Sequence, residues 1–133
     1  MRIAIDAMGG DQAPRMNVEG AILYDKENRG RHELILLGDQ NLLKQEMARH
    51  PHLKNHNIRI HHTSKIVEMS DSPTSVIKQK GDSSMIRGLQ MHKQGEFDAF
   101  VSAGSTGAQM VGSLLILGRI EGVQRPALGS FLP

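Results

Sequence analysis

The 133-residue chain lacks cysteine, which excludes disulfides, thiolate zinc ligands and a cysteine nucleophile within it. Aromatic residues make up only 3% of the chain, so its core must be built from aliphatic side chains and methionine. The formal charge is only +2, and no run of Lys and Arg is dense enough to predict a nucleic-acid partner. The length fits one domain that can bury a core of its own.

Long apolar runs are missing as well. Asp6 interrupts the first apolar stretch, which is too short for a signal peptide. The longest later stretch, around residues 110–117, is too short to span a bilayer. We therefore expect a cytosolic protein.

Short apolar runs alternate with helical patterns along the chain. Strands are expected at residues 2–5, 33–37, 57–62 and 97–101, and at the start of a fifth strand within 127–132. Helices are expected at 14–28, from Leu42 to Pro51, from Ser72, from Asp82 or Ser83, and at 105–117. This alternation predicts an α/β fold, Rossmann-like, with a mostly parallel sheet and helices on both faces.

Two segments predict how the layers are arranged. The continuous apolar run Leu34–Leu37 is typical of a parallel strand that is covered on both faces. The pattern at 105–117 is apolar nearly all round, which predicts a central, buried helix.

Glycine turns follow the first and fourth strands, at Gly9-Gly10 and at Gly104-Ser105-Thr106-Gly107. Free backbone N–H groups at such helix starts suit an anion, most often phosphate. A side chain at Gly104 is expected to displace that anion while leaving the fold intact. Neither turn matches a P-loop or a dinucleotide fingerprint, so the alternative that these glycines only make tight turns stays open.

Charged residues near these turns are further candidates. Asp6 ends an apolar strand, where a carboxylate needs a partner, whereas Asp11 is better interpreted as a cap of the next helix. Lys78 and Lys80 precede a capped helix start and could neutralise phosphate, although a solvated helix end is the simpler interpretation.

Five of the seven histidines lie between positions 50 and 62, namely His50, His52, His56, His61 and His62. Pro51 disfavours a continuous helix there, and no carboxylate falls at ligand spacing. We therefore interpret them as solvated surface residues and expect no metal.

Several sequence blocks occur together and in order. They are Asp6-Ala-Met-Gly-Gly-Asp11, Asp71-Ser-Pro73, Lys80-x-Asp82-Ser-Ser-Met85, Asp98-Ala-Phe-Val-Ser-Ala-Gly104-x-Thr-Gly-Ala108, and Gly118-Arg-Ile120 with Arg125-Pro-Ala127. In this order they closely resemble the N-terminal part of the bacterial phosphate acyltransferases, the fatty acid/phospholipid synthesis proteins.

The resemblance implies acyl transfer from acyl-acyl-carrier-protein to inorganic phosphate, giving acyl phosphate for phospholipid synthesis. It also implies a fold similar to phosphotransacetylase and isocitrate dehydrogenase, no cofactor, and a homodimer that associates peripherally with the membrane. Because family members are longer, residues 1–133 are expected to be the N-terminal part of a single acyltransferase domain, inactive alone. The alternatives are a non-catalytic module that binds phosphate or carrier protein, and a phosphotransacetylase-like enzyme that uses acetyl-CoA.

The site residues follow from the matched blocks. The catalytic candidates are Asp6, Lys80 and Ser102. The candidates for binding phosphate or substrate are Gly9, Gly10, Asp11, Asp82, Ser83, Ser84, Gly104, Ser105, Thr106 and Gly107. Ser105 departs from the family, which commonly has Asn at this position.

Overall fold

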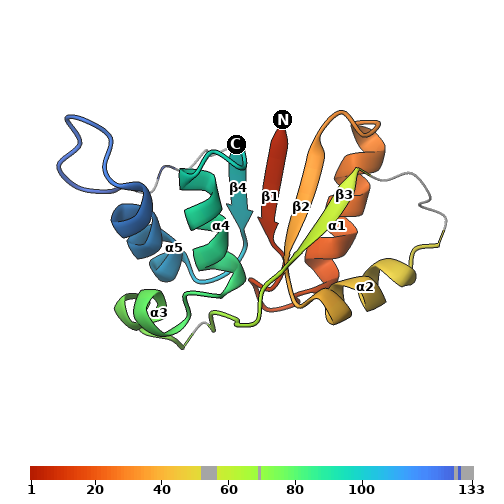
Figure 1. Cartoon of the computed structure of the whole chain (residues 1–133), viewed down its shortest axis with the longest axis horizontal. Coiled ribbons are helices and arrows are strands. Elements are labelled where there is room, and N and C mark those ends of the chain that lie inside the picture. The colour runs from red at the N-terminus through yellow and green to blue at the C-terminus, as the bar shows by residue number, and fades with distance from the viewer. Residues whose placement is uncertain (52–56, 69, 128, 130–133) are drawn as a thin grey trace.

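A computed structural model describes residues 1–51, 57–68, 70–127 and 129 (Figure 1). Strands and helices alternate as the sequence predicts, with ends that differ by a few residues. The elements are β1 (Arg2–Asp6), α1 (Arg15–Glu27), β2 (Glu33–Gly38), α2 (Gln40–Ala48), β3 (Ile58–His62), α3 (Pro73–Gln79), α4 (Ser84–Lys93), β4 (Ala99–Ser102), α5 (Thr106–Gly112) and the π-helical turn η1 (Ser113–Leu117).

The four strands form one parallel sheet in the order β3-β2-β1-β4. Ile3 is paired with Leu34 of β2 on one side and with Ala99 of β4 on the other. The predicted parallel α/β fold is therefore confirmed. The chain moves outward from β1 to β3 and then returns to the other side of β1. This reversal lies between β1 and β4, and ligands of open α/β sheets bind beyond the carboxyl ends of strands at such a point.

Helices cover both faces of the sheet. On one face, Leu34 and Leu36 of β2 pack in a cluster with Val18 and Ile22 of α1 and with Leu43 of α2. The alternate residues Ile35 and Leu37 point to the other face, where their cluster includes Met91 of α4. Figure 1 shows α1 and α2 on one side of the strands and α3, α4 and α5 on the other. The two-sided burial predicted for Leu34–Leu37 is confirmed.

The helix predicted at 105–117 is not central. It is α5 continued by η1, and within these two elements only Ala108 and Gly112 are buried, together with Ser105 just before them. Leu115 is 63% exposed, and a groove of about 710 Å³ runs along this outer face. The prediction of a buried helix was wrong because one side packs on α4, while the described residues provide no layer over the other side.

The start of α1 differs from the prediction. Helix α1 begins at Arg15 with Pro14 at its N-cap and no side-chain capping bond, so the interpretation of Asp11 as a cap was wrong. A cap must directly precede the first helical turn, and Asp11 comes several residues too early.

The strand predicted at 127–132 lies almost wholly outside the described residues, as do His52 and His56.

Candidate functional site

The two glycine turns meet at the carboxyl ends of β1 and β4. Both Gly9 and Gly104 are buried. A Cβ atom at Gly104 would lie 2.6 Å from the Gly9 Cα atom and 2.9 Å from the Gly10 nitrogen. The turns therefore touch through backbone atoms. A side chain at Gly104 would strike Gly9 before it reached a ligand, so the expectation that Gly104→Val leaves the fold intact is corrected.

A buried carboxylate links the same two turns. Asp6 is only 2% exposed, and its side chain accepts hydrogen bonds from the Met8 N–H and the Ser102 hydroxyl, at 3.2 and 2.8 Å. The Ser102 Oγ atom in turn accepts a 3.1 Å hydrogen bond from the Gly104 N–H. Asp6 thus has the partners that a buried carboxylate needs, and it orients the serine hydroxyl toward the late turn.

Asn17 is a site residue that sequence reasoning missed. It lies in the first turns of α1, and its side-chain amide donates to the carbonyl oxygens of Asp6, Ala7 and Gly9 at 3.4, 3.0 and 2.8 Å. Through these three bonds, α1 holds the backbone of the Gly9-Gly10 turn in place. An asparagine early in a helix, just after a glycine turn, is the sequence signal that could have identified this clamp, because Asn readily bonds nearby backbone.

The late turn keeps some donors for a ligand. Ser105 has φ 20° and ψ 89°, and its Oγ atom accepts the Ala108 N–H at the start of α5. The Gly104 N–H is used by Ser102. Within the described part of the chain, the amides of Thr106 and Gly107 form no hydrogen bond. These amides, together with the exposed Thr106 hydroxyl, are the groups at this turn that could receive an anion.

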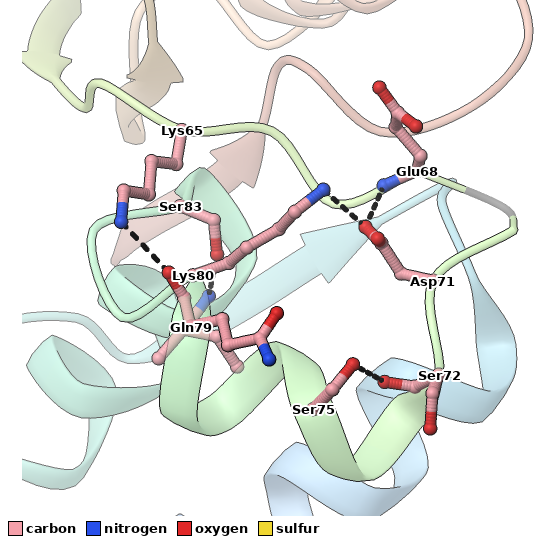
Figure 2. A network of polar contacts seen from close by, with 9 residues as sticks. Lys65, Glu68, Asp71, Ser72, Ser75, Gln79, Lys80 and Ser83 are labelled. Atoms are coloured by element: carbon pink, nitrogen blue, oxygen red, sulfur yellow. Dashed lines mark hydrogen bonds and ion pairs between the residues drawn. The ribbon is translucent and has the colours of Figure 1, made fainter.

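Lys80 lies in a separate polar network (Figure 2). Its ammonium donates to an Asp71 carboxylate oxygen at 2.5 Å, and the same oxygen accepts the Glu68 N–H at 2.7 Å. The Lys80 bond, and after it the Glu68 amide, hold the pKa of Asp71 below its ordinary value. The Lys80 and Asp71 side chains are 25% and 20% exposed, so the pair remains within reach of solvent.

The other residues of the Lys80 block hold the chain together locally. Asp82 accepts hydrogen bonds from the hydroxyl and the N–H of Ser64, and these two bonds, the hydroxyl first, hold the pKa of Asp82 below its ordinary value. Ser83 caps α4 by accepting the Ile86 N–H, which confirms one of the two predicted caps. Ser83 and Ser84 are both buried.

The structure joins some of the predicted site residues directly and others only through the packing of helices. Asp6, Gly9, Ser102 and Gly104 are in contact. Asp11 is exposed. Helices α3 and α5 meet at their starts, because a Cβ atom at Gly107 would lie 3.3 Å from the Pro73 Cγ atom. No hydrogen bond joins Lys80 to either glycine turn within the described ranges.

A comparison with known protein families decides what this arrangement belongs to. The fatty acid synthesis protein family matches the chain over residues 1–133. The chain belongs to this family. The resemblance inferred from the ordered sequence blocks is therefore confirmed.

Relatives within the family are named phosphate acyltransferases. Those of Caldicellulosiruptor bescii, Clostridioides difficile and Acetivibrio thermocellus are 50%, 45% and 42% identical to this chain over 133 residues. Each alignment covers 100% of this chain and 38–39% of the relative. The chain thus spans just under two fifths of the length of the curated relatives that it matches.

Two further features bear on the function of this family member. Among the residues that the structure describes, no three His, Asp or Glu side chains gather closely enough to hold a metal ion. A search of the same residues for a helix of sufficient length and hydropathy to cross a bilayer finds none.

Proposed function

We propose that this chain forms the phosphate-positioning part of an enzyme that transfers an acyl group from acyl-acyl-carrier-protein to inorganic phosphate. The observation that carries the proposal is the 50% identity, over the whole chain, to the phosphate acyltransferase of Caldicellulosiruptor bescii. The position of the glycine turns supports it, because they lie where the strand order reverses, and α/β sheets bind ligands there.

Acyl transfer to phosphate depends more on the positioning of the two substrates than on a strong base. A phosphate oxygen attacks the thioester carbonyl carbon, the new C–O bond forms, the C–S bond breaks, and the carrier protein leaves as its thiolate. Negative charge that develops on the carbonyl oxygen needs preorganised N–H donors. We assign this role to the amides of Thr106 and Gly107, which have no partner among the described residues.

The remaining candidates have different roles. Lys80 carries a positive charge that suits phosphate, and we assign it to charge neutralisation. Asp6, Ser102, Gly9, Gly10 and Gly104 set the shape of the paired turns, and Ser105 caps the helix start. Asp82, Ser83 and Ser84 support the α3–α4 turn, where Asp82 is bonded to Ser64 and Ser83 caps α4. Asp11 is solvent-exposed, and we assign it only to contact with the substrate.

The test is a chimera in which this chain replaces the 133 matched residues of the Caldicellulosiruptor bescii relative. Purified chimera is supplied with acyl-acyl-carrier-protein and inorganic phosphate, and acyl phosphate is measured. We expect product, and we expect Lys80→Met to raise the KM for phosphate at least tenfold, about 1.4 kcal/mol. The matched control is Lys93→Met, an exposed lysine at the far end of α4, which should leave the KM unchanged.

Each alternative function predicts a different outcome. Faster turnover with acetyl-CoA than with the carrier protein would favour a phosphotransacetylase-like enzyme. A folded chimera that binds phosphate but forms no acyl phosphate would favour a non-catalytic binding module.

A further inference from the structure

The loop after β3 is fastened to the turn between α3 and α4. Within residues 63–72, Ser64 bonds to Asp82, the Lys65 ammonium donates to the Gln79 carbonyl at 2.8 Å, and Asp71 pairs with Lys80. The Lys65 N–H also donates to the Asp82 carbonyl. Figure 2 shows the Lys65 ammonium at the Gln79 carbonyl and the Lys80 ammonium at Asp71, in two separate places. Of these contacts, the Asp71–Lys80 pair is the ion pair.

The Lys80 side chain spans the length of the helix that it follows. Lys80 is the C-cap of α3, whereas Asp71 directly precedes Ser72, the N-cap of the same helix. The lysine therefore extends back along α3 toward the start of that helix. Pro73 at this start lies against Gly107 of α5. A lysine has a long flexible side chain, and only a fixed partner holds it in one such position.

Asp71 is such a fixed partner. Its carboxylate is anchored by the Glu68 N–H at 2.7 Å as well as by Lys80. An ammonium has three donors, and Asp71 receives one of them, so the others remain for an anion. Lys65 does not compete for this role, because its ammonium is directed to the Gln79 carbonyl.

We propose that Asp71 is a positioning residue, which holds the Lys80 ammonium near the junction of α3 and α5 so that it can bind inorganic phosphate there. This inference rests on the proposed function only in its assignment of Lys80 to phosphate. Asp71 itself does not touch the anion. It acts through Lys80, by limiting where the ammonium can lie.

The experiment measures inorganic phosphate binding to the isotopically labelled 133-residue chain by NMR titration. We expect shifts at Lys80 and at the Thr106 and Gly107 amides in the wild-type chain. Asp71→Asn should weaken phosphate binding about tenfold, equivalent to about 1.4 kcal/mol. Asp71→Glu should restore part of the affinity, because it keeps the charge.

A double-mutant cycle separates positioning from a general structural effect. If Asp71 acts through Lys80, then Asp71→Asn should add no further loss in a Lys80→Met background. The matched control is Asp98→Asn. Asp98 also accepts a backbone N–H and pairs with a cation, Arg2, but this pair lies at the amino ends of β1 and β4. This control should leave the affinity unchanged.

Three results would overturn the proposal. They are additive losses in the cycle, tighter phosphate binding by Asp71→Asn, and no phosphate-dependent shift at Lys80 in the wild-type chain. The chimera assay tests acyl transfer by a separate readout. A chimera without turnover, alongside a non-additive binding cycle, would reject the proposed function and keep the role of Asp71.

Discussion

The turns after β1 and β4 and the loop after β3 all follow the carboxyl ends of strands, but different interactions hold them in place. In the paired turns, Gly9 and Gly104 are in backbone contact, and the linking side chain, Asp6, is buried. In the loop, Asp71 and Lys80 are partly exposed and opposite in charge. Close packing resists any added atom, whereas exposed ion pairs are weakened by salt and reform easily.

This difference suggests a division of labour. A rigid pair of turns can hold backbone donors in a fixed place, which is what stabilisation of a developing charge requires. A charged loop near solvent can adjust when an anion arrives. The two regions should therefore respond differently to mutation, salt and pH, and the following predictions address that contrast.

The largest effect is expected where the turns touch. Gly104→Ala places a Cβ atom 2.6 Å from the Gly9 Cα atom, and neither backbone can move aside easily. We expect the free energy of unfolding to fall by about 2–3 kcal/mol, as measured by urea denaturation. Gly20→Ala is the control, because a Cβ atom there meets nothing within 4 Å and Ala favours a helix by about 0.5–1 kcal/mol. Equal effects of the two changes would show that the turns are not closely packed.

A smaller loss is expected when the buried link is removed. Asp6→Ala leaves the Met8 N–H without its acceptor and the Ser102 hydroxyl with only the 3.4 Å bond to the Gly104 carbonyl. We expect thermal and urea denaturation to show a loss of about 2 kcal/mol. Asp11→Ala, at an exposed position, should change stability by less than about 0.5 kcal/mol. If Asp6→Ala is as mild as Asp11→Ala, the carboxylate does not hold the turns together.

The charged loop should show its contribution only under particular solution conditions. Because the folded-state pKa of Asp71 is lowered, its stabilisation is present above the unfolded pKa, about 4. It is lost as the pH falls from there through the folded-state pKa. The stability difference between wild type and Asp71→Asn should therefore be greatest at neutral pH and low salt.

Urea denaturation at several pH values and salt concentrations checks this prediction. The Asp71→Asn difference should shrink in about 1 M salt, because the ion pair is partly exposed and salt weakens ion pairs that solvent reaches. The Asp6→Ala difference should persist in the same salt, because its partners are buried. A salt-independent Asp71→Asn difference would remove the contrast between the two regions.

The smallest effect is expected at the position where this chain departs from its family. Ser105 caps α5 from a backbone conformation with φ 20°. Asn tolerates positive φ better than most residues and is also a good helix cap. Ser105→Asn should therefore change the free energy of unfolding by less than about 0.5 kcal/mol. Ser105→Val, which cannot cap and is β-branched, is the contrasting variant and should unfold at clearly lower urea concentration.

Local patterns predicted most of the fold because they depend on neighbouring residues. The apolar run Leu34–Leu37 is uninterrupted, and this alone indicates a strand that is buried on both faces. The helix at 105–117 shows the limit of such patterns. Its composition is apolar, yet burial depends on whether another layer covers it, and a single segment does not carry that information.

The candidate site was predictable in its types of residue but less so in their partners. Glycine turns at strand ends and a capping Ser83 follow from short motifs, and both appear where expected. Asn17 was missed because an amide within a helix has many ordinary roles. Lys80 was noted as a charge, but its pairing with Asp71 could not be derived, because a flexible side chain can reach many partners.

The sequence by itself determined the succession of strands and helices along the chain, the lack of cysteine and the membership of the fatty acid synthesis protein family. Only the tertiary structure decided that Asp6 would meet Ser102, 96 residues away, and that Gly9 would lie against Gly104. The reason is that such contacts depend on which strands become neighbours. Strand order is set by the packing of all layers together, whereas hydrophobic periodicity records only whether each strand is buried.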